Sequence, residues 1–137
     1  MFGGGGEPQG MAETGASNRM MIVEDDPATR RAFWAAFWRH GWVVRSAATV
    51  AEALDLLGRG PEPDGMILDL ILPDGDGLDV LRRVRDAGLR ARVAVCTGTS
   101  DPMLLMRARA LKPDLLLIKP VAPDVLSNLC AARAHLS

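Results

Sequence analysis

Short, mostly apolar runs of four or five residues recur along the chain and constrain its fold more than any other feature. Runs of this length, bounded by polar or turn-forming residues, are typical of buried strands. The chain contains five of them, at 20–23, 42–45, 66–70, 93–96 and 115–118. Each run precedes a segment with helix signals, and strands that alternate with helices require a parallel sheet covered by helices on both faces. We therefore predict an α/β fold.

Recognisable start and stop signals bound the helices. Asp26-Pro27 and Asp101-Pro102 each combine an N-cap residue with proline at the first helical position, and Thr49 is a further cap. Gly41 and Gly58 supply stops. These signals predict helices over 27–40, 50–57, 78–87, 102–110 and from 123 to near the C-terminus. Right-handed crossovers between parallel strands then favour a doubly wound sheet.

Composition divides the chain into a tail and one domain. Residues 1–18 include four consecutive glycines and too few apolar side chains to offset the entropy cost of ordering, so we expect a flexible tail. Residues 19–137 have the length of one ordinary domain. With 48% hydrophobic and 24% charged residues, the whole chain is neither disordered nor a disulfide scaffold.

Charge and hydropathy exclude several kinds of partner. The formal net charge of −1 argues against a nucleic-acid binder, which would need a basic face. No apolar run reaches the roughly 18 residues that span a bilayer, and the N-terminus lacks the regions of a signal peptide. Cys96 and Cys130 are interpreted as reduced, buried thiols. We therefore expect a cytoplasmic protein with no membrane partner and no direct nucleic-acid partner.

Polar side chains stand where four of the five predicted strands end, the edge at which doubly wound sheets bind ligands. They are Glu24-Asp25-Asp26, Asp69, Thr97 and Lys119. Converging carboxylates repel one another unless a cation joins them, and a hard divalent ion such as Mg2+ prefers oxygen ligands. A metal, an ammonium and a hydroxyl around one carboxylate can hold phosphoryl oxygens. Asp69 is then placed to act as a nucleophile and form an aspartyl phosphate.

These motifs, in this order, resemble the receiver domain of two-component response regulators over about residues 19–136. The resemblance rests on Val23-Glu24-Asp25-Asp26, on Leu68-Asp69-Leu70 with Pro73 and Gly77 following, on Thr97-Gly98 and on Lys119-Pro120. It implies a five-stranded, doubly wound (βα)5 parallel sheet with the flavodoxin-like strand order 2-1-3-4-5. It also implies a phosphorylation-activated signalling switch.

The resemblance assigns a role to each matching residue. Asp69 matches the phosphoacceptor, which takes its phosphoryl group from a phosphohistidine of a histidine kinase or phosphotransfer protein. The implied metal is Mg2+, with Mn2+ as a second candidate. Its implied ligands are Asp25 directly, Glu24 through water, Asp69, and the backbone carbonyl of Ile71. Thr97 matches the switch hydroxyl and Lys119 the phosphate-binding lysine, with a cis bond to Pro120.

Two other functions compete with the switch. The family often carries Tyr or Phe three residues before the lysine, whereas this chain has Leu116. An adaptor that keeps the fold but works by protein contacts without phosphorylation is therefore one alternative. A phosphatase with an aspartyl intermediate is another, but it would need an acid where Ile71 stands. The chain ends with its fifth predicted helix, so we interpret it as a stand-alone receiver or a fragment, with an unknown downstream protein target.

The first predicted helix separates its aromatic side chains. At 100° per residue, a stripe of Phe33, Ala36, Phe37 and His40 should pack on the sheet, with His40 partly buried. Trp34 and Trp38 should point away from that stripe. We interpret them as a docking or self-association patch, which makes a homodimer a further expectation, with packing against neighbouring residues as the alternative. Asp26 is interpreted as a helix cap, and His135 as a solvated side chain.

Overall fold

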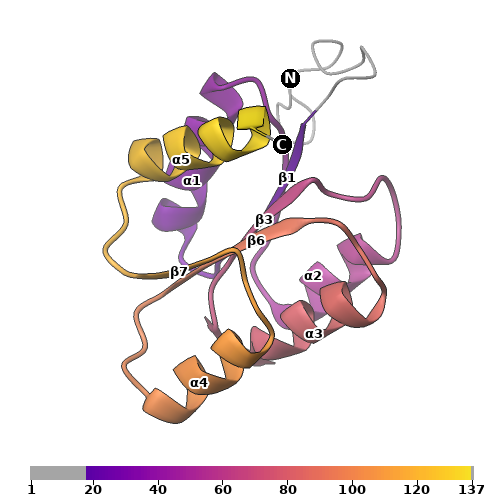
Figure 1. The fold of residues 1–137 in the computed structure, drawn as a ribbon, viewed down its shortest axis with the longest axis vertical. Coiled ribbons are helices and arrows are strands. Elements are labelled where there is room, and N and C mark those ends of the chain that lie inside the picture. The colour runs from indigo at the N-terminus through magenta and orange to yellow at the C-terminus, as the bar shows by residue number, and fades with distance from the viewer. Residues whose placement is uncertain (1–17, 137) are drawn as a thin grey trace.

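The computed structural model describes residues 18–136, with side chains described for residues 18–130. Five parallel strands form one sheet in the order β2-β1-β3-β6-β7 (Figure 1). Their bounds are β1 Arg19–Val23, β2 Val43–Ala47, β3 Gly65–Leu68, β6 Arg92–Thr97 and β7 Leu115–Ile118. Counted along the chain, this is the order 2-1-3-4-5, so the predicted fold is confirmed. The predicted tail lies outside the described residues, apart from residue 18.

Five helices cover the two faces of the sheet. Their bounds are α1 Pro27–Arg39, α2 Val50–Leu57, α3 Leu78–Asp86, α4 Pro102–Ala110 and α5 Pro123–Leu136. Figure 1 shows α1 and α5 side by side on one face, and α2, α3 and α4 on the other. Within residues 18–136, no helix is long and apolar enough to cross a membrane.

Every fully covered strand contributes to two cores because its side chains alternate between the faces. In β1, Met21 and Val23 pack beneath α2, α3 and α4. Met20 and Ile22 point the other way and pack with Phe33 and Phe37 of α1. This double burial explains why the strands read as continuous apolar runs rather than as alternating patterns.

The helix caps are confirmed by their hydrogen bonds. Asp26 accepts from the backbone N–H of Thr29 at 2.8 Å and from its hydroxyl at 2.6 Å. Asp101 accepts from the N–H of residue 103 at 3.0 Å. Thr49 accepts from the N–H of Glu52 at 3.0 Å, and the Glu52 carboxylate accepts from the N–H of residue 48 at 2.7 Å. Thr49 is thus the N-cap of α2, and Glu52 reaches back to the N–H of the residue before the cap rather than to that of Thr49 itself.

A small hairpin follows β3 where the sequence predicted only a turn. Residues Ile71–Leu72 (β4) and Gly75–Asp76 (β5) pair antiparallel, and β3 ends at Leu68 rather than at residue 70. Asp74 at the tip accepts hydrogen bonds from Val50 N at 2.8 Å and Ala51 N at 3.0 Å. The first turn of α2 therefore anchors the hairpin. The sequence did not reveal these strands because two residues are too few to show an alternating pattern.

The aromatic stripe of α1 is confirmed in part. Phe33, Ala36 and Phe37 are buried, but His40 is exposed, which corrects the prediction that it is partly buried. The helix ends at residue 39, so His40 lies beyond the last packed turn, with Nδ1 2.9 Å from the Ala36 carbonyl oxygen. His135 lies outside the described side chains.

Trp34 and Trp38 stack on each other but differ in exposure. Their ring centroids lie 6.2 Å apart with an interplanar angle of 12°. Trp38 is 40% exposed, whereas Trp34 is partly buried against the core beneath α1 and α5. The outward direction predicted for both rings is therefore wrong for Trp34, whose ring follows the alternative of packing against neighbouring residues.

The two cysteines also differ. Cys96 is buried, as predicted, and burial raises the pKa of its thiol to about 12. Cys130 is only partly buried, which corrects that half of the prediction. The thiol of Cys96 is therefore protonated and unreactive near neutral pH.

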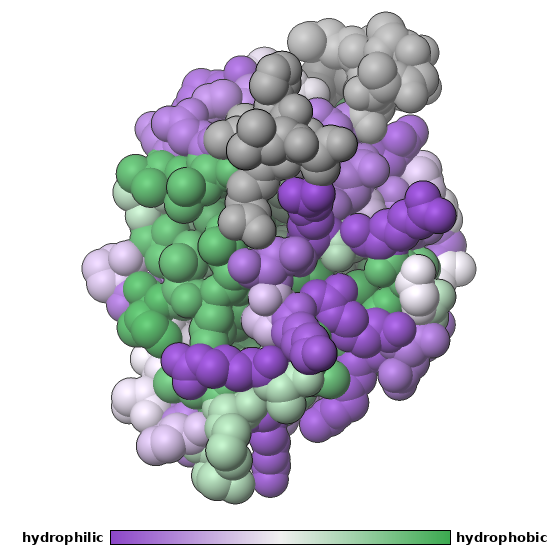
Figure 2. Space-filling model, in the orientation of Figure 1, coloured by the Kyte–Doolittle hydropathy of each residue, from purple (hydrophilic) through white to green (hydrophobic). Residues whose placement is uncertain are grey.

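An apolar surface borders β7, which is an edge strand of the sheet. Ile118 at the end of β7 is 53% exposed, and Val125 and Leu129 of α5 are 56% and 43% exposed. Figure 2 shows hydrophobic side chains gathered on this side of the molecule. The opposite edge strand, β2, is bordered by α1 and α2.

Candidate functional site

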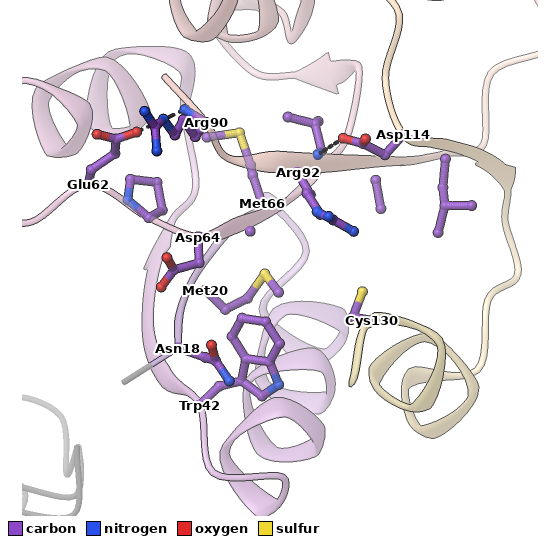
Figure 3. A pocket seen from close by; sticks show the side chains of 15 residues that line it. Asn18, Met20, Trp42, Glu62, Asp64, Met66, Arg90, Arg92, Asp114 and Cys130 are labelled. Carbon is purple, nitrogen blue, oxygen red and sulfur yellow. Dashed lines mark hydrogen bonds between the residues drawn. The ribbon is translucent and has the colours of Figure 1, made fainter. Parts of the chain in front are cut away.

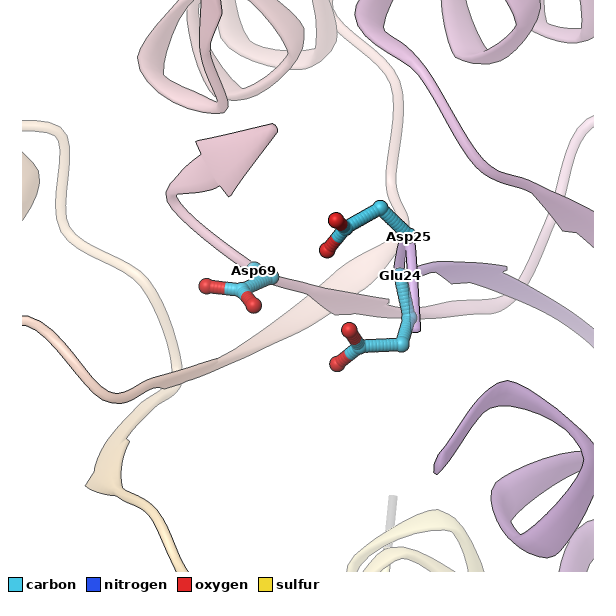
Figure 4. Close-up of side chains that lie close together, drawn as sticks. All are labelled: Glu24, Asp25 and Asp69. Carbon is cyan, nitrogen blue, oxygen red and sulfur yellow. The ribbon is translucent and has the colours of Figure 1, made fainter. Parts of the chain in front are cut away.

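The central acids converge because their strands are neighbours in register. In the β1–β3 pair, Val23 lies opposite Leu68, so the residues that follow them leave the sheet side by side. The Asp69 N–H donates to the Val23 carbonyl at 3.0 Å. Glu24, Asp25 and Asp69 each offer a carboxylate oxygen within 4.8 Å of the others. Figure 4 shows the three carboxylates around the same space at the ends of the two strands.

Two of the three acids are buried, which makes their compensation by positive charge important. Glu24 is 2% exposed and Asp69 is 6% exposed, whereas Asp25 faces solvent. Lys119, at the end of β7, donates from Nζ to Glu24 Oε1 at 2.6 Å and to Asp69 Oδ2 at 2.8 Å. One ammonium therefore pairs with both buried carboxylates.

The same contacts determine the protonation of Lys119. Partial burial disfavours its charged form, but hydrogen bonds and attraction from Asp69 and Glu24 outweigh that effect and raise the pKa of Lys119. The backbone contributes to its placement, because the Lys119 N–H donates to the Thr97 carbonyl at 2.9 Å. The bond from Lys119 to Pro120 is cis, as the resemblance implied.

Thr97 stands at the predicted edge, but its side chain is engaged by the following loop. It is buried at the end of β6, and its hydroxyl oxygen accepts from the Thr99 N–H at 3.3 Å. The open cavity at this edge, about 490 Å³, is lined by Asp25, Asp69, Ile71, Leu72, Pro73, Gly98, Thr99 and Lys119. Four of the predicted site residues, Asp25, Asp69, Ile71 and Lys119, thus line one cavity, and Glu24 and Thr97 are not part of its lining.

Ile71 joins the site through its backbone. Its N–H donates to Asp69 Oδ1 at 3.2 Å, and its side chain is 52% exposed. The hairpin returns so closely that a Cβ on Gly77 would collide with the Asp69 backbone carbonyl. Gly77 is therefore required by close approach of the backbone, which the sequence marked only as part of a turn.

The donor set suits a hard divalent cation. All its side-chain ligand candidates are carboxylate oxygens, and Lys119 compensates only part of the charge of Glu24, Asp25 and Asp69. Such clusters favour Mg2+ over softer metals, which prefer nitrogen or sulfur. Exposed Asp25 gives an ion access to the cluster from solvent.

A second cavity, of about 420 Å³, lies at the amino-terminal ends of the strands, opposite the first cavity. Its lining contains none of the predicted site residues. Its walls include Met20, Trp42 and Met66 (Figure 3). The acids there are tied to backbone: Asp64 accepts from Arg19 N at 2.7 Å, and Asp114 accepts from the N–H of residue 93 at 2.7 Å. Convergent carboxylates and a lysine make the first cavity the candidate functional site instead.

Comparison with protein-family models identifies the family of the chain. The model described as response regulator receiver domain matches residues 20–131. The chain therefore belongs to the receiver domain family of two-component response regulators.

Relatives and solved structures agree with the family. The transcriptional regulatory protein TrcR of Mycobacterium tuberculosis is 31% identical over 115 residues, 82% of this chain and 43% of that protein. The response regulator MprA of a Mycobacterium species is 34% identical over 91 residues, which are 66% of this chain and 35% of MprA. The chain thus spans less than half the length of these relatives.

Two solved structures share the fold. The CheY-like receiver domain protein of Methanospirillum hungatei superposes with a TM-score of 0.80 at 23% identity, covering 86% of this chain and 94% of its own. The N-terminal domain of an uncharacterized protein from Wolinella succinogenes has a TM-score of 0.80 at 29% identity, covering 88% of this chain and 96% of its own.

Proposed function

We propose that the chain is a phosphorylation-dependent signalling switch in which Asp69 accepts a phosphoryl group. The observation that carries this proposal is the position of the Asp69 carboxylate. It lies at a cavity mouth, 2.8 Å from the Lys119 ammonium and beside the carboxylates of Glu24 and Asp25. A buried carboxylate with this much nearby charge suits transfer chemistry that depends on positioning and charge neutralisation.

The proposed donor is a phosphohistidine on a histidine kinase or phosphotransfer protein. An Asp69 carboxylate oxygen forms a bond to phosphorus as the P–N bond breaks. The imidazole leaves with the electron pair and takes up a proton from solvent. Lys119 lies where it can hold a phosphoryl oxygen, and Thr97 can offer its hydroxyl once it releases the Thr99 N–H.

Mg2+ is the proposed cofactor, with Mn2+ as a substitute. Asp25, Asp69 and the backbone carbonyl of Ile71 would hold it, and Glu24 would act through water. When bound, the ion neutralises charge on the phosphoryl oxygens. The residues of the chain supply the rest: Asp69 the nucleophile and Lys119 a mobile positive charge.

The proposed protein contacts involve α1. The stacked Trp34 and Trp38 present one exposed ring, and exposed aromatic side chains commonly anchor interfaces. We propose this surface for docking the phosphodonor or a second copy of the chain. The downstream target is a protein, and the proposed setting is the cytoplasm.

Acetyl phosphate labelling tests the proposal. With MgCl2, intact-mass measurement should detect one added phosphoryl group on the wild type. Labelling should disappear with EDTA and in Asp69→Asn. A wild type that stays unlabelled by acetyl phosphate and by phosphorylated kinases would instead support the phosphorylation-independent adaptor, for which Leu116 in place of an aromatic residue is the supporting observation.

A further inference from the structure

Arg30 reaches back from α1 to the acidic turn that ends β1. Its Nη1 donates to the Glu24 carbonyl at 2.9 Å and to the Asp25 carbonyl at 3.2 Å. These are the two residues whose side chains join Asp69 in the carboxylate cluster. One guanidinium nitrogen therefore holds two consecutive peptide units of the turn that presents the acids.

Other bonds in this turn hold the Glu24 side chain and the N–H groups of Glu24 and Asp26, and Arg30 holds the carbonyls. The Asp26 N–H donates to Glu24 Oε2 at 3.1 Å, and Lys119 donates to Glu24 Oε1 at 2.6 Å, so the Glu24 side chain is held at both oxygens. Among the described residues, no hydrogen bond holds the exposed Asp25 carboxylate, so its direction depends on the backbone beneath it. Arg30 bonds the carbonyls of Glu24 and Asp25, and the Glu24 carboxylate bonds the N–H of the second peptide unit.

We propose that Arg30 is a positioning residue for the divalent cation site: it fixes the peptide units of Glu24 and Asp25 so that their carboxylates face Asp69. The proposal rests on the proposed function, because it requires that the cluster binds Mg2+. Arg30 does not touch the ion. It acts on the groups behind the ligands, and loss of such supporting contacts typically weakens metal affinity about tenfold or more.

Two effects of Arg30 on Mg2+ affinity oppose each other, so the direction in which the Kd changes tests the proposal. Its positive charge repels a bound cation, so removal of charge alone should tighten Mg2+ binding. Its hydrogen bonds preorganise the turn, so their removal should weaken binding. A merely structural role in α1 would lower the stability of the metal-free protein and leave the affinity of the folded protein unchanged.

The experiment is an MgCl2 titration followed by two-dimensional amide NMR, which reports Kd and folding together. We expect Arg30→Met to raise the Kd for Mg2+ about tenfold. Arg30→Lys keeps the charge and can donate to the same carbonyls, so it should stay within about threefold of the wild type. Arg31→Met is the matched control, because Arg31 is the exposed neighbour on the same helix, and its Kd should not change.

Each outcome is decisive. An unchanged or tighter Kd in a folded Arg30→Met variant overturns the proposal. A wild type that binds no Mg2+, or an Asp25→Asn variant that binds it normally, refutes the metal site itself and is separate from a failure of Arg30. If Arg30→Met does not fold, Arg30→Leu, which likewise cannot donate to the two carbonyls, is titrated in its place under the same criteria.

Discussion

Lys119 offers the sharpest energetic test because it pairs with two buried carboxylates at once. Replacing it with methionine keeps the length of the side chain but leaves Glu24 and Asp69 as uncompensated neighbouring charges. Breaking a buried pair by removing one partner costs about 3–5 kcal/mol. Because the Lys119 side chain is 26% exposed and water can reach the site, we expect the lower end, about 3 kcal/mol.

Urea unfolding at neutral pH without metal measures this loss. Adding Glu24→Gln to Lys119→Met should recover about half of the lost free energy, because one of the two stranded charges is removed. A cost below about 1 kcal/mol for Lys119→Met would place the pair among ordinary surface ion pairs and refute the reasoning.

The pH dependence of the difference has a definite sign. Folding raises the pKa of Lys119, so its contribution is fully present below the ordinary lysine pKa of about 10.4 and is lost as pH rises through the higher folded value. The free-energy gap between wild type and Lys119→Met should therefore stay constant from about pH 7 to 9 and shrink only in more alkaline solution. A gap that closes below pH 9 would contradict this assignment.

Three further predictions concern the surroundings of the site. Gly77→Ala should destabilise the protein by about 1–3 kcal/mol in urea unfolding, because its Cβ would collide with a backbone carbonyl; an unchanged midpoint would show that the hairpin yields freely. Backbone hydrogen bonds from α2 lower the pKa of Asp74, so its contribution is present above about pH 4 and lost as pH falls through the lower folded value. The melting temperature of Asp74→Ala should therefore lie below that of the wild type at pH 7 and approach it in acid, and equal values at pH 7 would count against the anchor. Trp38→Ala should cost less than about 1 kcal/mol and Trp34→Ala about 2 kcal/mol or more, because only Trp34 packs against the core; equal costs would refute that difference.

Local chemistry made much of the fold predictable. Proline after Asp26 and after Asp101 marked helix starts that the structure places at those residues. Uniformly apolar runs indicated strands covered on both faces, and parallel strands bring their carboxyl ends to one edge. The convergence of Glu24, Asp25 and Asp69 followed from that rule and is present in the structure.

What could not be predicted depends on contacts between distant segments. The hairpin after β3 is anchored where its Asp74 accepts a hydrogen bond from Val50 N at the start of α2. This contact spans 24 positions, and no local pattern encodes it. Helical periodicity placed Trp34 outward, but its ring packs against a core to which distant segments contribute, among them Leu126 of α5. Arg30 lies four residues after the cap Asp26. Its hydrogen bonds to the carbonyls of the acidic turn depend on the backbone conformation of that turn, which the sequence alone does not give.

The central claim is that Asp69 itself carries the phosphoryl group. After labelling with acetyl phosphate and Mg2+, borohydride reduction converts an acyl phosphate to an alcohol, so peptide mass spectrometry identifies the residue that was modified. We predict homoserine at position 69 and unmodified acids at positions 24 and 25. Reduction at either of those acids, or a labelled protein with an intact Asp69 peptide, would contradict the claim.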